Sequence, residues 1–292
     1  MTSFQVRDVD TGQHTYYLLF PWADGNLIQV FKHFNDKQSR LGRCVWMAEQ
    51  CYELAKAVRL VHNEREVHLR LIMEDDRESE QKHELYGRHG DIKAENVLWY
   101  KKQNMLVLSD FGLGRLNTKY SRSKADPRHL DKTMTYRAPE FDTRGGRISR
   151  KSDVFSLGCL CLEFMTWYME GYEAVVTDFP DFRQEPDVWN FMSDSFFRVE
   201  DFEQPSERAV IKPRVTEWID RLRHGEHGSE YIDQFLNLVK RMLEPDVKKR
   251  PDARSAENEL RTLRDACRQN SSFYTKRELS APDVRTRLKF RT

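Results

Sequence analysis

The sequence has no long apolar run and no secretory leader. Its longest strongly apolar stretch, residues 157–165, contains Glu163 and is far shorter than the ~20 residues that a membrane-spanning helix needs. The first twenty residues carry Arg7, Asp8 and Asp10 and lack the apolar core of a signal peptide. We therefore expect a soluble, intracellular protein with no membrane partner, located in the cytoplasm, with the nucleus as the alternative.

An excess of charge of one sign is also missing. Lys and Arg number 48 against 47 Asp and Glu, which gives a net charge of +1 over 292 residues. Nucleic-acid-binding domains usually show a clear basic excess, so we expect no nucleic-acid partner. The apolar content of 39% is nevertheless enough for a folded core in one large domain or two small ones.

Paired cysteines are absent as well. The five cysteines form no C-x-x-C motif and are odd in number; they are Cys44, Cys51, Cys159, Cys161 and Cys267. This usage is typical of small buried apolar residues in a reducing compartment. The nine histidines do not cluster around them, which argues against a zinc site.

The apolar patterns that are present predict a short β-rich start followed by helices. Residues 4–8 and 16–20 flank a turn signal at 10–12 and predict a hairpin, and residues 97–100 and 105–108 predict a second one. Helical periodicity predicts a short helix from 24–26 to about Phe34 and a long, half-buried helix over 44–62. Beyond residue 150 we expect helices only, and the three most periodic stretches are 151–167, 231–243 and 253–267. The fold class is therefore α+β, with helix dominant.

Two segments fall outside these patterns. Residues 63–88 are rich in charge and include an acidic block at 74–76, so they form either a docking loop or a solvated insertion. From Arg268 onward the chain carries seven Lys and Arg residues against Glu278 and Asp283, which predicts a basic tail.

Three short motifs follow one another in the middle of the chain. Residues 89–96 read H-G-D-I-K-A-E-N, D-F-G begins nineteen residues after Asp91, and A-P-E stands at 138–140. Their order and spacing resemble the catalytic loop, metal-binding motif and activation-segment end of protein kinases. The resemblance covers about residues 15–267, and the chain is identified as a member of that family.

The resemblance implies a protein-kinase-like fold with a mainly helical large lobe. Residues 1–22 would be a remnant of the small β-lobe and the hinge, residues 23–267 the large lobe with the 63–88 insertion, and residues 268–292 the tail. In such a lobe Asp153 begins a buried helix and accepts backbone N–H groups of the catalytic loop. Glu140 and Arg250 are then expected to form a buried ion pair, because either charge alone would be costly to bury.

The resemblance also implies ATP and Mg²⁺ as cofactors and a protein as substrate. Asp110 and Asn96 would bind the metal ions through oxygen atoms, which hard cations prefer. Asp91 would orient the substrate hydroxyl and accept its proton, with Lys93 offsetting charge at the γ-phosphate. Thr133 would hydrogen-bond to Asp91 and Lys93.

The adenine site and the substrate type follow from the same resemblance. The carbonyl of Pro21 and the N–H of Ala23 would bind the base, with Leu98 as its apolar floor. Lys93 and the T-M-T-Y sequence at 133–136 are similar to Ser/Thr kinases, although Lys132 stands where that pattern has glycine. We therefore expect transfer to Ser and Thr hydroxyls.

Two features depart from the family. No G-x-G-x-x-G loop or strand lysine precedes the hinge, since the first glycine is Gly12 and the first lysine is Lys32. We expect the chain to begin at the fourth strand of the small lobe, with exposed apolar side chains over 16–20. Gly90 replaces the arginine of H-R-D, which removes a phosphate partner, and His89 is expected to be structural rather than catalytic.

Two functions therefore stay open. The first is a Ser/Thr protein kinase whose phosphoryl transfer is weak or absent in the isolated chain. The second is a catalytically silent, kinase-like binding or scaffold module.

Overall fold

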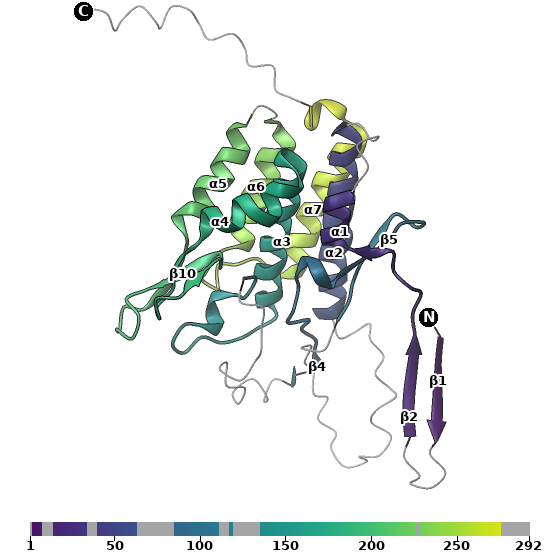
Figure 1. Ribbon diagram of the computed structural model, residues 1–292, viewed down its shortest axis with the longest axis horizontal. Coiled ribbons are helices and arrows are strands. Elements are labelled where there is room, and N and C mark those ends of the chain that lie inside the picture. The colour runs from purple at the N-terminus through teal and green to yellow at the C-terminus, as the bar shows by residue number, and fades with distance from the viewer. Residues whose placement is uncertain are drawn as a thin grey trace, which may run out of the picture.

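In the part of the chain that the structure describes, a mainly helical body carries five small antiparallel sheets (Figure 1). The computed structural model describes residues 2–7, 14–33, 40–62, 85–110, 117–118, 135–225 and 228–275. Its helices are α1 Leu27–His33, α2 Arg40–His62, α3 Lys151–Glu170, α4 Phe179–Arg183, α5 Pro213–His224, α6 Glu230–Met242 and α7 Ala253–Gln269. None of the helices in this part of the chain has both the length and the apolar character needed to cross a membrane.

Helix α3 is the centre of the body. It is apolar on all sides, and 16 of its 20 residues are buried, as expected for a helix surrounded by others. Helices α2, α5, α6 and α7 all pack against it. At Gly158 a side chain would collide with α6, because an added Cβ would lie 2.9 Å from the Cβ of Met242. Glycine at this position therefore allows the close packing of α3 on α6.

Side-chain caps mark the starts of α1, α6 and α7. The side chains of Ser229 and Asp252 accept backbone N–H groups three residues ahead, at the first turns of α6 and α7. In front of α1, Asn26 and Gln29 exchange side-chain and backbone hydrogen bonds of 2.9 and 3.2 Å, which is a capping box. These caps fix where three helices begin.

The strands form hairpins and one three-stranded sheet. The pairs are β1 Thr2–Arg7 with β2 His14–Leu19, β4 Leu85–Tyr86 with β7 Asn117–Thr118, β8 Glu185–Pro186 with β9 Met192–Ser193, and β10 Phe197–Glu200 with β11 Arg208–Ile211. The larger sheet has the order β3-β5-β6, with β3 at Gly25–Asn26, β5 at Val97–Tyr100 and β6 at Met105–Leu108. The β1–β2 hairpin extends away from the helical body (Figure 1).

Most of the predicted elements are confirmed. Both predicted hairpins exist, and α1, α2, α3, α6 and α7 begin and end within a few residues of the predicted helices. The expectation of helices only beyond residue 150 is wrong, because residues 185–211 form the β8–β9 and β10–β11 hairpins. In β10 the alternation Phe197, Arg198, Val199, Glu200 is a strand pattern, but it is short and stands between stretches of much stronger helical periodicity.

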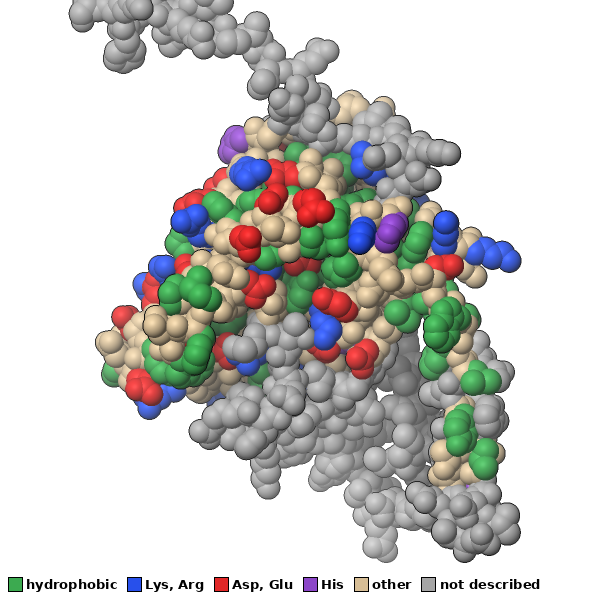
Figure 2. Space-filling view, viewed as in Figure 1, with side chains coloured by type: hydrophobic (Ala, Val, Ile, Leu, Met, Phe, Trp, Pro, Cys, Tyr) green, Lys and Arg blue, Asp and Glu red, His purple; other side chains and the backbone are tan. Residues whose placement is uncertain are grey.

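The β1–β2 hairpin exposes apolar side chains. Tyr17, Leu19 and Phe20 are 45%, 53% and 64% exposed, and Trp22 just after them is 97% exposed. Figure 2 shows this apolar surface along the hairpin. The expectation of apolar exposure at the end of the hairpin is confirmed for these side chains.

The two segments without a clear pattern are described only in part. Of the 63–88 insertion the structure describes 85–88, where Gly87 and Arg88 are buried against the body. Of the tail it describes 268–275, which contain the end of α7 and a short 3₁₀ turn at Ser271–Phe273. The acidic block at 74–76 and the basic residues from 276 onward lie outside the described residues.

Candidate active site

Asp153 fixes the backbone of the 89–91 loop from the first turn of α3. Its Oδ2 accepts the N–H of His89 at 2.8 Å, and its Oδ1 accepts the N–H of Gly90 at 2.9 Å. Nε2 of His62, the last residue of α2, lies 2.8 Å from the same Oδ2. Burial raises the pKa of Asp153, but the hydrogen bonds from His62, Gly90 and His89 outweigh it and hold that pKa below its usual value. The predicted role of Asp153 is confirmed.

His89 is fully buried and links the 89–91 loop to the end of β6. Its Nε2 lies 3.0 Å from the carbonyl oxygen of Ser109, and burial lowers the pKa of the ring, which favours the neutral form. This position confirms the structural role that we expected for His89. Gly90 follows with φ of 85°, a left-handed conformation that glycine adopts without the penalty of a Cβ. The glycine that replaces the arginine of H-R-D therefore suits the backbone of the loop.

Asp91, Lys93 and Asn96 meet in one polar cluster. Nζ of Lys93 lies 2.9 Å from Oδ2 of Asp91, and Nδ2 of Asn96 donates to the same oxygen and to the Asp91 carbonyl, each at 2.9 Å. A 3₁₀ turn at Ala94–Asn96 produces this convergence. The carboxylate of Asp91 is 13% exposed, so it is held by two donors at the edge of solvent.

Ser109 places Asp110 next to that cluster. Its N–H and its Oγ both donate to the carbonyl oxygen of Asn96, at 2.8 and 2.9 Å. Asp110 follows with φ of 63°, a left-handed conformation that is uncommon outside glycine and less so for Asp and Asn. The Asp110 side chain is exposed.

The donor set at this edge fits Mg²⁺. Both hydrogen bonds of the Asn96 amide group use its nitrogen, which leaves the amide oxygen for a cation, and Asp110 supplies a carboxylate. Mg²⁺ takes one or two protein oxygens and completes its shell with phosphate oxygens and water. Within the described ranges, no group of three or more His, Cys, Asp and Glu is suited to a metal.

The expected adenine-binding residues lie near the end of β5, whereas Asn96 directly precedes its start. The N–H of Asp24 donates to the carbonyl of Trp99 at 2.8 Å, and an Asp24 carboxylate oxygen accepts the N–H of Lys101 at 2.8 Å. These bonds hold residues 20–24 against the strand that carries Leu98. The Pro21 carbonyl accepts a hydrogen bond of 3.0 Å from Tyr100 Oη, which occupies one of its two lone pairs. Ala23 is half-buried beside it.

One predicted site residue cannot be placed. Thr133 lies outside the described residues, as do Phe111 and Gly112 of the D-F-G motif. The structure thus joins Asp91, Lys93 and Asn96 by hydrogen bonds, sets Asp110 beside them through Ser109, and ties the 20–24 segment to the strand of Leu98.

Two supports of the site were missed from the sequence. His62 stands 91 residues before Asp153, and a lone histidine at a helix end carries no pattern that assigns it a partner. Tyr136 donates to Oε2 of Glu163 at 2.7 Å and accepts Ser156 Oγ at its carbonyl, which anchors the A-P-E region to α3. A buried glutamate inside an apolar helix was the available signal for this second contact.

Glu140 and Arg250 form the predicted buried ion pair. Nη1 and Nη2 of Arg250 donate to the two carboxylate oxygens of Glu140 at 2.9 Å, and the side chains of Glu140 and Arg250 are 3% and 0% exposed. Arg250 also donates to the carbonyl oxygens of Glu244, Lys151 and Pro245, so its charge is fully hydrogen-bonded. The bidentate geometry ties the end of the A-P-E motif to the segment before α7.

Comparison with known proteins places these contacts in a known family. A family model of the protein kinase domain matches residues 80–260, so the chain belongs to the protein kinase family. Members of this family are phosphotransferases that use ATP, usually with Mg²⁺, and act on proteins.

Individual relatives are serine/threonine-protein kinases by name. The chain is 30% identical over 184 residues to serine/threonine-protein kinase ppk13 of Schizosaccharomyces pombe, which covers 55% of the chain and 52% of the relative. It is 40% identical over 92 residues to a probable serine/threonine-protein kinase of Dictyostelium discoideum, covering 30% of the chain and 11% of the relative. A G-type lectin S-receptor-like serine/threonine-protein kinase of Arabidopsis thaliana is 42% identical over 79 residues, covering 27% and 9%. The chain thus spans about half or less of the length of these relatives.

Proposed function

We propose that the 89–110 region is the catalytic half of a Ser/Thr protein kinase active site. The observation that carries this proposal is the hydrogen-bonded cluster of Asp91, Lys93 and Asn96. Asp153 accepts the backbone N–H just before this cluster, and Ser109 donates to the carbonyl oxygen of Asn96. Catalysis of phosphoryl transfer consists almost wholly of positioning and electrostatic stabilisation, so a fixed cluster of this kind is what the reaction requires.

Each residue of the cluster has a distinct task in this proposal. The Asp91 carboxylate orients the substrate hydroxyl and accepts its proton, since Asn96 and Lys93 fix its position. Lys93 carries positive charge toward the developing charge on the transferred group. Thr133 would add a hydroxyl contact to both residues.

The metal would bind beside Asn96 and Asp110, and the nucleotide base would bind beside residues 20–24. Asp110 and the amide oxygen of Asn96 are the proposed Mg²⁺ ligands, and the ion neutralises phosphate charge when bound. The Pro21 carbonyl and the Ala23 N–H would bind adenine, with Leu98 beneath it. In this assignment residues 1–22 belong to the small lobe and hinge, residues 23–267 form the large lobe, and residues 268–292 are a separate tail.

Ser/Thr specificity is supported by Lys93 and by the names of the relatives. The protein substrate itself is not specified by these residues. We propose only that the acceptor is a Ser or Thr hydroxyl on a protein.

These 292 residues alone should transfer phosphate weakly or not at all. The β1–β2 hairpin carries neither a glycine-rich loop nor a lysine that could hold the phosphates. A mobile γ-phosphate forfeits the positioning on which the reaction depends. The same observation favours the second candidate, a catalytically silent kinase-like binding module.

A longer chain, with added small-lobe strands before Met1, tests the proposal. We would fuse, before Met1, three strands that contain a glycine-rich loop and a strand lysine, and assay transfer of labelled phosphate to a mixed protein substrate. We expect phosphoserine and phosphothreonine, and loss of both in the matched Asp91→Ala chain. Equal background in the two extended chains, with unchanged thermal unfolding, would instead support the silent module.

A further inference from the structure

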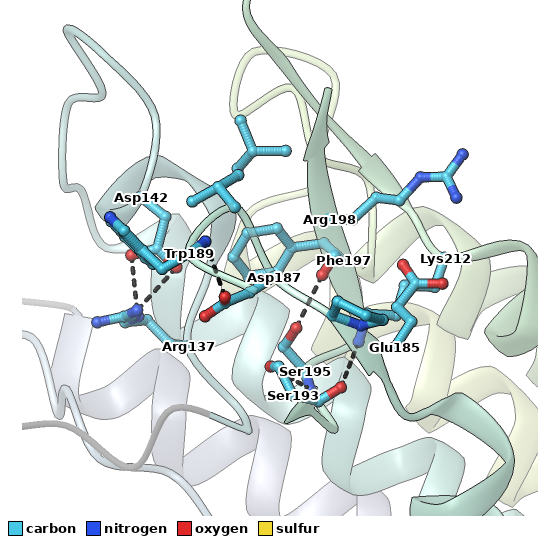
Figure 3. A pocket seen from close by; sticks show the side chains of 13 residues that line it. Arg137, Asp142, Glu185, Asp187, Trp189, Ser193, Ser195, Phe197, Arg198 and Lys212 are labelled. Atoms are coloured by element: carbon cyan, nitrogen blue, oxygen red, sulfur yellow. Dashed lines mark hydrogen bonds and ion pairs between the residues drawn. The ribbon is translucent and has the colours of Figure 1, made fainter. Parts of the chain in front are cut away.

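A pocket lies between the A-P-E turn and the two hairpins that the sequence did not predict. It encloses about 150 Å³, comparable to one large side chain, and apolar walls come from Pro186, Val188, Phe197 and Val199. Figure 3 shows Arg137 with Asp142 on one side, Glu185 with Lys212 on the other, and the Phe197 ring between them. This pocket is separate from the Asp91 cluster.

Apolar side chains extend the surface beyond the pocket. Trp189 on its rim is 57% exposed, and Phe191 and Met192 in the same loop are 71% and 62% exposed. Figure 2 shows hydrophobic side chains gathered at the end of the molecule where Figure 1 places β10. Adjacent large apolar side chains this exposed usually mark an interaction site.

The charged side chains of the pocket differ in whether they are paired. Arg137 is paired with Asp142 at 2.7 Å and Arg198 with Glu200 at 2.8 Å. Lys212 is bound to the carbonyl oxygens of Arg183 and Ser193. Glu185 and Asp187, in contrast, form no ion pair within the described part of the chain, although Oδ1 of Asp187 accepts the backbone N–H groups of Trp189 and Phe191, each at 2.9 Å. The cations are therefore engaged, and neither of these two carboxylates has a cation bound to it that a basic partner would have to displace.

Three polar atoms of the pocket residues also lack hydrogen-bond partners among the residues that the structure describes. They are Oε1 of Glu185 and the Nε atoms of Arg137 and Arg198. Buried polar atoms are rarely left unsatisfied, so each needs an explanation. These atoms are closed to solvent, so a docked peptide pairs with them only if the side chains that cover them shift. The apolar walls and the two carboxylates of the pocket themselves suit a peptide that is basic and apolar at once.

We propose that the chain's own C-terminal segment, residues 284–292, docks in this pocket. Its sequence V-R-T-R-L-K-F-R-T alternates apolar or neutral residues with four basic ones. In extended conformation such a segment presents Leu288 and Phe290 on one side and Arg287 and Lys289 on the other. The first pair suits the exposed aromatic rim, and the second suits Glu185 and Asp187.

Because the C-terminal segment is covalently attached to the chain, it can occupy the pocket even if its intrinsic affinity is weak. Residues 276–292 supply 17 residues after the described part, which can span roughly 55–60 Å when extended. The extended segment is therefore about twice as long as α3, whose 20 residues span about 30 Å. The segment is thus long enough to reach the pocket, and a tether of this length gives an effective concentration near the millimolar range.

Competition between the tethered segment and a free copy tests the proposal. The probe is a fluorescently labelled peptide of residues 284–292, titrated with the full chain and with a tail variant carrying Arg285→Glu, Arg287→Glu, Lys289→Glu and Arg291→Glu. We expect the peptide to bind the tail variant at least tenfold more tightly, because its pocket is free. Adding Glu185→Gln with Asp187→Asn, or Phe191→Ser, to the tail variant should weaken binding at least tenfold. Glu217→Gln with Asp178→Asn, two exposed carboxylates elsewhere, is the matched control and should change nothing.

Several outcomes would overturn the proposal. Equal affinity for the full chain and the tail variant would mean that the tail does not occupy the pocket, which would then be open to another partner. Loss of binding on neutralising Glu74, Asp75 and Asp76, but not Glu185 and Asp187, would place the tail on the acidic insertion. No measurable binding to the tail variant would exclude docking altogether. Thermal unfolding of every variant confirms that it is folded.

Discussion

Asp153 and Glu163, two buried carboxylates of α3, differ in how completely hydrogen bonds and ion pairs compensate their charge. Asp153 accepts three hydrogen bonds and has a lowered pKa, whereas Glu163 accepts one from Tyr136 and lies 4.0 Å from Arg183. Burial, only partly offset by Arg183 and Tyr136, raises the pKa of Glu163 to about 7. Two carboxylates of one helix thus titrate in different pH ranges because their partners differ.

The Glu140–Arg250 pair should dominate the stability of the lobe. Arg250→Ala leaves Glu140 buried without a partner, and breaking a buried pair in this way costs about 3–5 kcal/mol. Arg241→Ala is the matched control, because the Arg241–Glu259 pair is exposed and worth below about 1 kcal/mol. Urea unfolding measures both. Losses of similar size in the two variants would contradict the account.

Glu163 should make stability depend on pH near neutrality. Its folded-state pKa is raised, so the folded chain binds more protons than the unfolded chain between about pH 4.5 and 7. Its contribution therefore falls as pH rises through that range and is constant above it. Glu163→Gln should remove this fall. The difference in unfolding free energy between wild type and variant, measured at pH 5 and pH 8, isolates the effect from His89, whose lowered pKa acts in the opposite direction. The same difference at both pH values would be inconsistent with a raised pKa.

At the level of helices and strands, the sequence predicted the elements with a clear hydrophobic periodicity and missed the short strands that have none. α3 is an apolar run, and α6 and α7 keep one apolar face, so their helical nature was readable. β8 and β9 contain two residues each, which is too short for a period to be detected. The contacts that give the 185–211 region its shape, such as Arg183 bound to Asp194, join residues with no local pattern.

Close packing of α3 on α6 should be intolerant of added volume. Gly158→Ala gains about 1 kcal/mol of helix propensity, but its Cβ would lie 2.9 Å from the Met242 Cβ, which cannot swing away. Overpacking of this kind costs about 1–3 kcal/mol, so we expect net destabilisation of roughly 1 kcal/mol. Asn258→Ala on the exposed side of α7 is the control and should be neutral or stabilising. A more stable Gly158→Ala chain would show that the two helices move apart freely.

The hydrogen bonds between the Asp153 carboxylate and the 89–91 loop should determine how rigid that loop is. Asp153→Asn replaces a carboxylate that accepts at both oxygens with an amide that accepts at one, so the N–H of either His89 or Gly90 loses its acceptor. We expect faster amide hydrogen exchange in residues 85–96, with little change at β6. Uniform acceleration across the lobe would indicate a global loss of stability instead.

At the level of the whole molecule, the order and spacing of the motifs predicted more of the candidate site than the amino-acid composition did. Asp91, Lys93, Asn96 and Asp110 were predicted as site residues because they stand at fixed spacings in one short region, and a local turn brings the first three of them together. His62, Glu163 and the pocket could not be found in this way, because their partners are distant in sequence and chosen by packing.

The phosphoryl-transfer rate of the 292 residues is the measurement that tests the account most directly. Protein kinases turn over at roughly 1–100 per second, and the loss of one preorganised electrostatic contact in an active site costs about 10²–10³-fold. Because these residues lack both a glycine-rich loop and a strand lysine, we predict a rate at least that far below the family range at millimolar Mg²⁺–ATP, with little thermal stabilisation by the nucleotide. A rate within the family range that disappears in Asp91→Ala, together with stabilisation by several degrees, would contradict this account.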